Sequence, residues 1–376
     1  MENLAIVITA YNRADALRKL FKSLDSIHTE VSLPLIISID NHGTNEVIDV
    51  CNNYQWKFGP KEVIVHNERL GLKNHFIWAG DQTNRFENVL FLEDDLSVSP
   101  EIISFALQSI SFYKDDDRIA GISCYNPIYN LSHLRFYQTQ DGFDNYFLQH
   151  PYWGNIWFRD KWAKFKHYLE TYTEKLELLP ISAQNWNRSF KKIFIQYLVE
   201  TNRTIVIPRV SLVTNNGIGG GEHNKVVDPR FHVEHLLKMS RNFHFSRLEN
   251  SLSRYNAFEE IDPDILKSFN EVLREYDFEV DFTGNKGKFT KPYVLTARKV
   301  KSSVMSFSGH LKPTECGVML NVLGDNLFLA KAEDVCKESE IELYLFDFEK
   351  NTINSNPKIL FKVFLKSMIA SIKARL

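Results

Sequence analysis

The sequence predicts an α/β fold: an open, mostly parallel sheet with helices on both faces. Over the first hundred residues, short and nearly continuous apolar runs alternate with segments whose apolar residues recur at helical spacing. This alternation is typical of strand–helix–strand units. Each apolar run also ends in polar residues, as expected where strands of such a sheet reach its ligand-binding edge.

The expected elements follow one another closely. Residues 4–9 form an apolar run typical of a central parallel strand, and the helix after it has four apolar residues on one face: Leu17, Leu20, Phe21 and Leu24. Further strands are expected at residues 35–39, 63–65, 89–92, 119–123, 205–208 and 210–213, and a helix is expected over residues 71–83. Another helix is expected after residue 98, with Ser99 as its N-cap and Pro100 at its first position.

Three consecutive carboxylates, Glu93, Asp94 and Asp95, follow the strand expected at residues 89–92. Acids at the end of a core strand are costly to bury without a partner. A hard divalent cation is such a partner, because it prefers oxygen ligands and binds through one or two carboxylates plus substrate phosphates. Taken alone, the three acids fit a solvated acidic turn equally well.

Other polar side chains follow the neighbouring strands. Arg13, Asp40 and Asn67 each come just after an expected strand, and right-handed crossovers bring these strand ends to one edge. An arginine suits a diphosphate, an aspartate accepts hydrogen bonds from a ribose or base, and a carboxylate-bound cation bridges phosphates. The sequence has neither Gly-x-Gly-x-x-Gly after the first strand nor a P-loop, which disfavours both of those nucleotide folds.

The ordered motifs at residues 8–13, 38–40, 67–72 and 91–95 resemble those of GT-A nucleotide-sugar glycosyltransferases, in particular the bacterial family 2 group, over roughly residues 3–235. The Glu-Asp-Asp-Leu form of the acidic motif is similar to that of Golgi N-acetylglucosaminyltransferases. The resemblance implies that Asp95 holds Mn²⁺ or Mg²⁺ on the donor diphosphate. It also implies the donor-binding residues, which are Thr9, Tyr11, Arg13, Asp40 (at the base), Asn67, Lys73, Glu93 and Asp94 (at the ribose and sugar).

Two later segments also match the family pattern. Trp153 and Gly154 begin a Trp-Gly-x-x-Trp segment that, by resemblance, borders the acceptor site; core packing explains its tryptophans equally well. The glycine-rich segment at residues 215–224 ends in Glu222, His223 and Asn224. The resemblance places His223 near the phosphates or the metal and Glu222 near the reacting sugar, whereas a merely flexible connection is the alternative.

The expected catalytic base is missing from its usual position. Inverting enzymes of this group need a carboxylate that takes the proton of the acceptor hydroxyl, and relatives carry an Asp beside a Trp before the last strand. This chain has Gln-Asn-Trp-Asn at residues 184–187. Glu222 is therefore the first candidate for the base. Alternatively, the alignment of this chain with the family is shifted at this point, or the chain is a degenerate enzyme that lacks a catalytic base.

The tail is expected to contain a helical segment over residues 236–280 that packs on the domain of residues 1–235, with residues 281–291 as a possible linker. A small accessory region without an assigned role follows over 281–356. Residues 357–376 predict a helix with a lysine stripe and a wide apolar face. Such a helix fits either an anionic membrane surface or docking on protein.

The composition argues against a nucleic-acid-binding protein. With a net charge of −2, the chain lacks the excess of basic residues that such proteins carry. Its four widely spaced cysteines suit a reducing compartment. With no export signal expected, the sequence predicts a cytoplasmic enzyme, peripheral to the membrane, that acts in polysaccharide biosynthesis. The resemblance implies that it transfers a sugar from a UDP-sugar to a hydroxyl of a glycan or lipid-linked glycan, with inversion. The alternatives are a non-catalytic nucleotide- or glycan-binding protein and a sugar nucleotidyltransferase.

Overall fold

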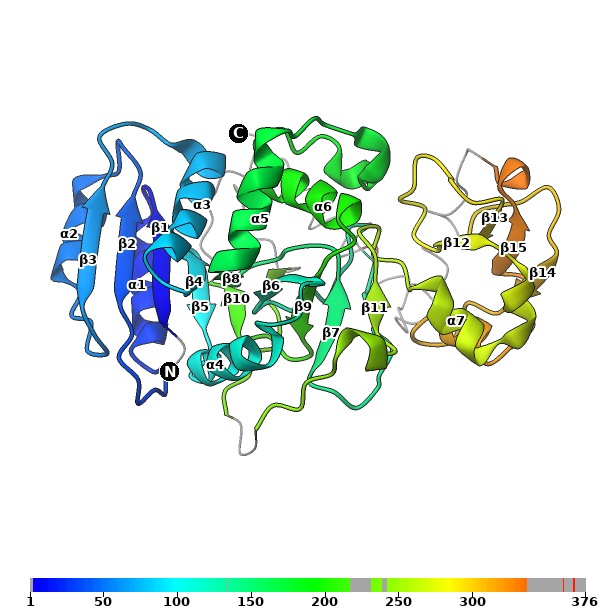
Figure 1. Cartoon of the computed structure of the whole chain (residues 1–376), viewed down its shortest axis with the longest axis horizontal. Helices are drawn as coiled ribbons and strands as arrows, with labels where there is room; N and C mark the ends of the chain where they lie inside the picture. Colours follow the sequence, from blue (N-terminus) through cyan, green and yellow to red (C-terminus); the bar gives the residue numbers. More distant parts are fainter. Residues whose placement is uncertain are drawn as a thin grey trace.

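The chain is described by a computed structural model that covers residues 3–132, 134–216, 231–238 and 242–336, together with the single residues 361 and 368. These residues form one long sheet flanked by helices, with a smaller sheet beyond one of its edges (Figure 1). The smaller sheet, yellow to orange in the figure, lies beyond strand β11. Within the described residues, no helix is long and apolar enough to cross a membrane.

The long sheet is mixed, and its described part has nine strands. Their spatial order is β11 (Arg254–Tyr255), β7 (Asn145–Leu148), β9 (Thr204–Pro208), β6 (Ile119–Ser123), β8 (Asn155–Phe158), β4 (Asn88–Glu93), β1 (Leu4–Ala10), β2 (Leu35–Ile39) and β3 (Lys61–Val65). Strands β1 to β4 are parallel, whereas β8 runs antiparallel to both of its neighbours, β4 and β6. The expected α/β fold and its first four strands are confirmed.

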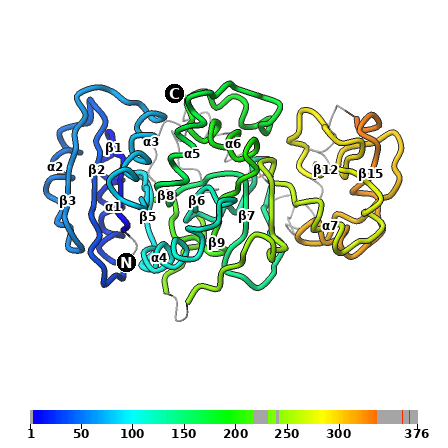
Figure 2. The backbone as a smooth tube through the Cα atoms, viewed as in Figure 1, coloured from blue at the N-terminus to red at the C-terminus, as the bar shows by residue number. Residues whose placement is uncertain are grey.

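Continuous apolar runs arise because both faces of the sheet are covered. In β1, Ile6 and Ile8 pack into one core, while Val7 between them packs into the other. Three helices cover the first face: α1 (Ala14–Leu24), α2 (Asn45–Asn53) and α4 (Ile102–Tyr113). The opposite face is covered by α3 (Gly71–Asp81), α5 (Arg159–Glu170) and α6 (Phe190–Glu200). The backbone trace in Figure 2 shows α5 and α6 next to each other, above the labels of β8 and β6 in this view.

Two expected boundaries are shifted. Helix α4 begins at Ile102, with Glu101 before it, and not at Pro100. Ser99 still acts near this end, because its hydroxyl accepts a hydrogen bond from the Glu101 amide (3.1 Å), but its own amide is bound to the Leu212 carbonyl. The strand expected at residues 210–213 lies further along, as β10 (Val213–Asn215), which pairs antiparallel with β5 (Leu96–Val98).

The prediction of a helical segment over residues 236–280 is wrong. In its described part the one α-helix is α7 (Pro263–Phe269), and β11 joins the edge of the long sheet beside β7. Polar side chains explain the short elements, since Ser251 and Asp262 accept hydrogen bonds from nearby amides and favour turns. Leu266 is buried in the core, whereas three other large apolar side chains of this segment are exposed: Leu237, Phe269 and Val272.

Residues 281–291 are not a linker. Asp281 ends β12 (Phe278–Asp281) and forms a buried ion pair with Arg298 at 2.6 Å. The smaller sheet continues with β13 (Tyr293–Thr296), β15 (Leu327–Lys331) and β14 (Met305–Phe307), and a short helix α8 (Cys316–Met319) packs near α7. Residues 337–356, and the amphipathic helix expected at 357–376 apart from two single residues, lie outside the described part of the chain.

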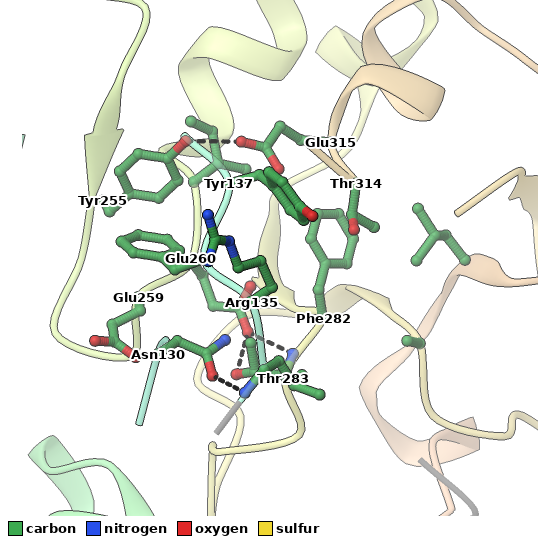
Figure 3. Close-up of a pocket in the computed structure, with 15 residues that line it drawn as sticks. Asn130, Arg135, Tyr137, Tyr255, Glu259, Glu260, Phe282, Thr283, Thr314 and Glu315 are labelled. Carbon is green, nitrogen blue, oxygen red and sulfur yellow. Dashed lines mark hydrogen bonds between the residues drawn. The ribbon is translucent and has the colours of Figure 1, made fainter. Parts of the chain in front are cut away.

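A cavity lined by buried carboxyl groups lies between the two sheets (Figure 3). Glu259 accepts a hydrogen bond from the Tyr152 hydroxyl (2.6 Å), Glu260 from the Thr283 amide (2.8 Å), and Glu315 from the Tyr255 hydroxyl (2.8 Å). Because protein groups already satisfy these carboxyls, the cluster joins the two sheets rather than presenting free ligand groups. Burial raises the pKa of Glu259 and that of Glu260 to about 7.

The raised pKa of Glu259 predicts that the folded state loses stability as pH rises. The folded protein binds this proton up to about pH 7, whereas an unfolded glutamate releases it near pH 4.3. The free energy of unfolding therefore falls by up to about 1.4 kcal/mol per pH unit between these values. Urea unfolding from pH 5 to pH 8 should show a shallower decline for Glu259→Gln than for the parent. The exposed Glu177→Gln is the control, and equal slopes in all three proteins would contradict the assignment.

A second prediction concerns the contact between α3 and α5. A Cβ atom at Gly80 would lie 2.0 Å from the ring of Trp162, which is 2% exposed and held by a 2.8 Å hydrogen bond from its indole nitrogen to Asp81. Gly80→Ala should lower the free energy of unfolding by about 1–3 kcal/mol. Gly287→Ala, where the nearest atom would be 3.8 Å away, should change it little. Equal stability of the two variants in urea unfolding would refute this packing.

Candidate functional site

The acidic motif forms a tight turn at the carboxyl end of β4. Strand β4 ends at Glu93 and β5 begins at Leu96, so Asp94 and Asp95 make the turn between them. Arg13 follows the adjacent strand β1 and reaches both aspartates: Nη1 donates to Asp95 Oδ2 at 2.8 Å, and Nη2 donates to Asp94 Oδ1. The expected neighbourhood of Arg13 and the acids is therefore present.

This turn concentrates negative charge in a poorly solvated place. Asp94 is 3% exposed, and burial raises its pKa to about 7 even though the guanidinium of Arg13 acts in the opposite direction. Burial also raises the pKa of the half-buried Glu93, and the charge of Asp95 adds to this effect. Arg13 is ion-paired with Asp94 and Asp95 but not with Glu93. The turn thus favours further positive charge.

One oxygen of the turn has no partner among the described residues. Asp95 Oδ1 is buried, and no hydrogen-bond donor of the described part of the chain reaches it. The described residues contain no group of three or more His, Cys, Asp or Glu side chains arranged to hold a metal ion. The donor set consequently fits an ion that binds through one carboxylate and takes its other ligands from phosphates and water, as Mg²⁺ and Mn²⁺ do.

Asp40 holds the loop that precedes α3. Its carboxylate is 4% exposed and accepts hydrogen bonds from the amides of Leu70 (2.7 Å), Gly71 (2.9 Å) and Asn41 (2.9 Å). The side chain of Leu70 does not cap α3, so Asp40, which follows β2, supplies the missing hydrogen-bond acceptors for the first amides of the helix. The sequence placed Asp40 at the sheet edge, but this binding to the helix start became visible only in three dimensions.

The other expected donor-binding residues lie around the same edge. Thr9 pairs in register with Ser38 on one side and with Glu93 on the other. The ring of Tyr11 lies 5.0 Å from the guanidinium carbon of Arg69. Asn67 is exposed, and its carbonyl accepts a hydrogen bond from the Asn41 side chain; Lys73 is exposed on the first turn of α3.

Trp153 and Gly154 lead into β8, whose amino end meets the carboxyl end of β4. Gly154 has φ +65°, and a Cβ there would lie 2.9 Å from Val213, so packing alone requires a glycine. Trp153 is half-buried with its ring 4.8 Å from that of Tyr125 and 5.2 Å from that of Phe231. It therefore packs among aromatic rings at the end of β8 that meets β4, and its place at the acceptor site stays a prediction.

Lys191 is a site residue that the sequence did not reveal. It lies in the first turn of α6, its Nζ is 4.9 Å from the centre of the Trp153 ring, and its charge interacts with Glu93 and Asp95. Burial lowers its pKa, against the influence of those two acids. Nearby, His150 is 2% exposed, and neither of its ring nitrogens has a hydrogen-bond partner among the described residues. Only the fold brings these residues from separate elements to the acids.

Glu222 and His223 lie outside the described residues. The last described residue before the glycine-rich run is Asn216, whose amide donates to the Asp95 carbonyl at 2.7 Å. Strand β10, which ends at Asn215, is paired with β5 next to the acidic turn. The chain thus enters the glycine-rich segment directly beside Asp95.

Comparison with known proteins agrees with this geometry. Residues 5–175 match the family model "Glycosyl transferase family 2". An alpha-1,3-mannosyl-glycoprotein 2-beta-N-acetylglucosaminyltransferase from Arabidopsis thaliana is 25% identical, over 32% of this chain and 31% of the relative. The chain therefore spans less than a third of this relative's length.

Two solved structures show a distant similarity to this chain. S. aureus TarS 1–349 in complex with UDP-GlcNAc has 13% identity and a TM-score of 0.37, over 59% of this chain and 60% of that one. Mannosyltransferase PcManGT from Pyrobaculum calidifontis, in complex with GDP-Man and Mn²⁺, has 9% identity and a TM-score of 0.36, over 55% of this chain and 57% of that one. The match over residues 5–175 therefore identifies this part of the chain as a glycosyl transferase family 2 domain of the GT-A type.

Proposed function

We propose that the protein transfers a sugar from a UDP-sugar to a hydroxyl of a glycan or lipid-linked glycan, in a metal-dependent reaction that inverts the anomeric centre. The observation that carries this proposal is Asp95 Oδ1, which has no partner among the described residues and lies beside Arg13, just after β4, in a family 2 domain. A cation bridged to a diphosphate would give this carboxylate oxygen a partner at the ligand-binding edge of the sheet.

The donor would lie along the edge formed by the ends of β1, β2 and β4. Asp95, and His223 as a second ligand, would hold Mn²⁺ or Mg²⁺, which when bound supplies positive charge to the leaving diphosphate. Arg13 holds the two aspartates in place and adds charge of the same sign. Glu93 and Asp94 would bind the ribose and the sugar, while Asp40, directly after β2, would contact the base. Thr9, Tyr11, Asn67 and Lys73 would complete this set.

The acceptor would approach from the side of Trp153 and Gly154. Its hydroxyl oxygen attacks the anomeric carbon, the bond to the diphosphate breaks with its electron pair, and the hydroxyl proton passes to a base. Glu222 is the proposed base. Because the reaction joins two bound molecules, holding both in the productive orientation supplies a large part of the rate enhancement.

Other parts of the proposal concern the sugar, the membrane and the pathway. The name of the plant relative supports N-acetylglucosamine as the first donor sugar to test. Residues 357–376 would hold the enzyme on the cytosolic face of the membrane, where a lipid-linked glycan in polysaccharide biosynthesis is within reach.

A second candidate function is binding without catalysis, which the Gln-Asn-Trp-Asn sequence at residues 184–187 favours because it lacks the usual acid. A transferase converts its nucleotide sugar into products, whereas a binding protein does not. Calorimetric binding of UDP, without transfer to any glycan and without hydrolysis of any nucleotide sugar in Mn²⁺, would support the binding protein.

Asp95→Ala should lower transfer or donor hydrolysis by more than about 100-fold, because the ligand that places positive charge on the leaving group is lost. The measurement is UDP release from UDP-GlcNAc and other nucleotide sugars with Mn²⁺. Asp49→Ala, an exposed acid on α2, is the matched control and should keep full activity. Full activity of Asp95→Ala would rule out the metal assignment.

Asp40→Asn should affect both stability and nucleotide binding. Loss of an acceptor for the α3 amides should lower the free energy of unfolding by about 1–3 kcal/mol, and loss of the base contact should weaken uridine binding. Thr44→Ala is the control: it removes the N-cap of α2, where Thr44 accepts from the Val47 amide at 3.3 Å, and should reduce stability alone. If Asp40→Asn also reduces stability alone, Asp40 serves the fold and not the nucleotide.

A further inference from the structure

The ammonium group of Lys191 lies near the acidic turn, and no oxygen atom of the described residues pairs with it. Its ammonium makes no hydrogen bond and no ion pair with them, and it lies 4.9 Å from the centre of the Trp153 ring. The other lysine of this turn behaves differently: Lys192 is buried, donates to the Gln184 carbonyl at 2.7 Å and pairs with Glu174. Lys191 is thus available to an anion that the fold itself does not supply.

The surroundings hold this ammonium at a defined place. Ser189 caps α6 and accepts from the Lys191 amide at 3.2 Å, which fixes the first turn of the helix. Trp153 then supports the ammonium through its ring, and Trp153 is itself packed against Tyr125. A cation fixed by a helix end and an aromatic ring loses little conformational freedom when it binds a ligand.

The direction of the side chain also matters. Lys191 interacts electrostatically with Glu93 and Asp95 from the α6 side of the acidic turn, whereas Arg13 comes from the β1 side and is occupied by Asp94 and Asp95. Arg13 therefore compensates Asp94 and Asp95, whereas Lys191 forms no ion pair with the described acids and remains for an anionic group next to them. A diphosphate that a cation bridges to Asp95 would be such a group.

We propose that Lys191 binds the diphosphate of the nucleotide sugar directly and that Trp153 positions it for this role. The inference rests on the proposed function, because it assumes a nucleotide-sugar donor at the acidic turn. Negative charge on the leaving diphosphate grows as its bond to the sugar breaks, and a fixed ammonium stabilises that charge without transferring a proton. Lys191 thereby assists departure of the nucleoside diphosphate, while the acceptor proton goes elsewhere.

The test is calorimetric titration of the full chain with UDP, GDP and uridine in the presence of Mn²⁺. Lys191→Met keeps most of the side-chain length but removes the charge, and it should weaken UDP or GDP binding at least about 10-fold. Uridine binding should stay within about 2-fold of the parent, since uridine has no phosphate. Lys191→Arg should recover part of the diphosphate affinity. Lys22→Met, on the exposed last turn of α1, has the same change in net charge and should bind like the parent.

The outcomes separate the inference from the function on which it rests. If the parent binds UDP or GDP and Lys191→Met binds it equally well, or if uridine loses as much affinity, Lys191 does not contact the diphosphate although the proposed function stands. If the parent binds neither UDP nor GDP, both proposals are wrong. Thermal unfolding of each variant identifies a loss of affinity that arises from misfolding, and recovery in Lys191→Arg excludes that cause.

A double variant separates a direct contact from simple charge compensation of Glu93. If Lys191 only offsets the charge of Glu93, then Glu93→Gln should restore UDP affinity in the Lys191→Met background. If Lys191 binds the diphosphate, the double variant should bind no more tightly than Lys191→Met alone. Restoration to the parent affinity would overturn the inference.

Discussion

The ion pairs between Arg13 and the carboxylates of Asp94 and Asp95 hold together the ends of the two central strands, β1 and β4. They hold two acids at a place where burial, together with the neighbouring acids and against the effect of Arg13, raises the pKa of Asp94 to about 7. Removing the guanidinium would leave charges in a poorly solvated turn, which is far costlier than losing an exposed ion pair. Asp95 Oδ1, which has no partner among the described residues, has its position because this turn is fixed.

The long sheet converts local sequence patterns into a single site. Parallel strands β1, β2 and β4 end at one edge, and antiparallel β8 begins there, so Arg13, Asp40, Asp95 and Trp153 meet although they are far apart in the chain. On the α6 side, Lys191 lies over the ring of Trp153 and brings positive charge toward the acids. Tyr152, the neighbour of Trp153, donates a hydrogen bond to Glu259, which follows β11. This hydrogen bond ties the segment that carries Trp153 to the edge of the long sheet.

The N-terminal half was predictable because its signals are local. The runs that became β1, β2 and β4 are buried on both faces, and such strands read as continuous apolar segments. Arg13, Asp40 and the acids were found because polar residues after buried strands converge at one edge. In contrast, no local signal indicates that β8 inserts between β4 and β6, or that Lys191 of α6 faces Glu93, since both depend on packing between distant segments. The same applies to residues 242–281, where a turn at Ser251, strand β11 and the short helix α7, capped by Asp262, take the place of the expected long helix.

The central claim is that the acidic turn joins a nucleoside diphosphate to a divalent cation. Electron paramagnetic resonance of Mn²⁺ tests it most directly, because bound and free Mn²⁺ give different spectra. Titration of the protein with Mn²⁺ in the presence of UDP should show one tightly bound ion per chain. The binding should weaken without UDP and disappear in Asp95→Ala. A spectrum that remains that of free Mn²⁺ with UDP present, or an Asp95→Ala variant that binds Mn²⁺ as well as the parent, would contradict the account.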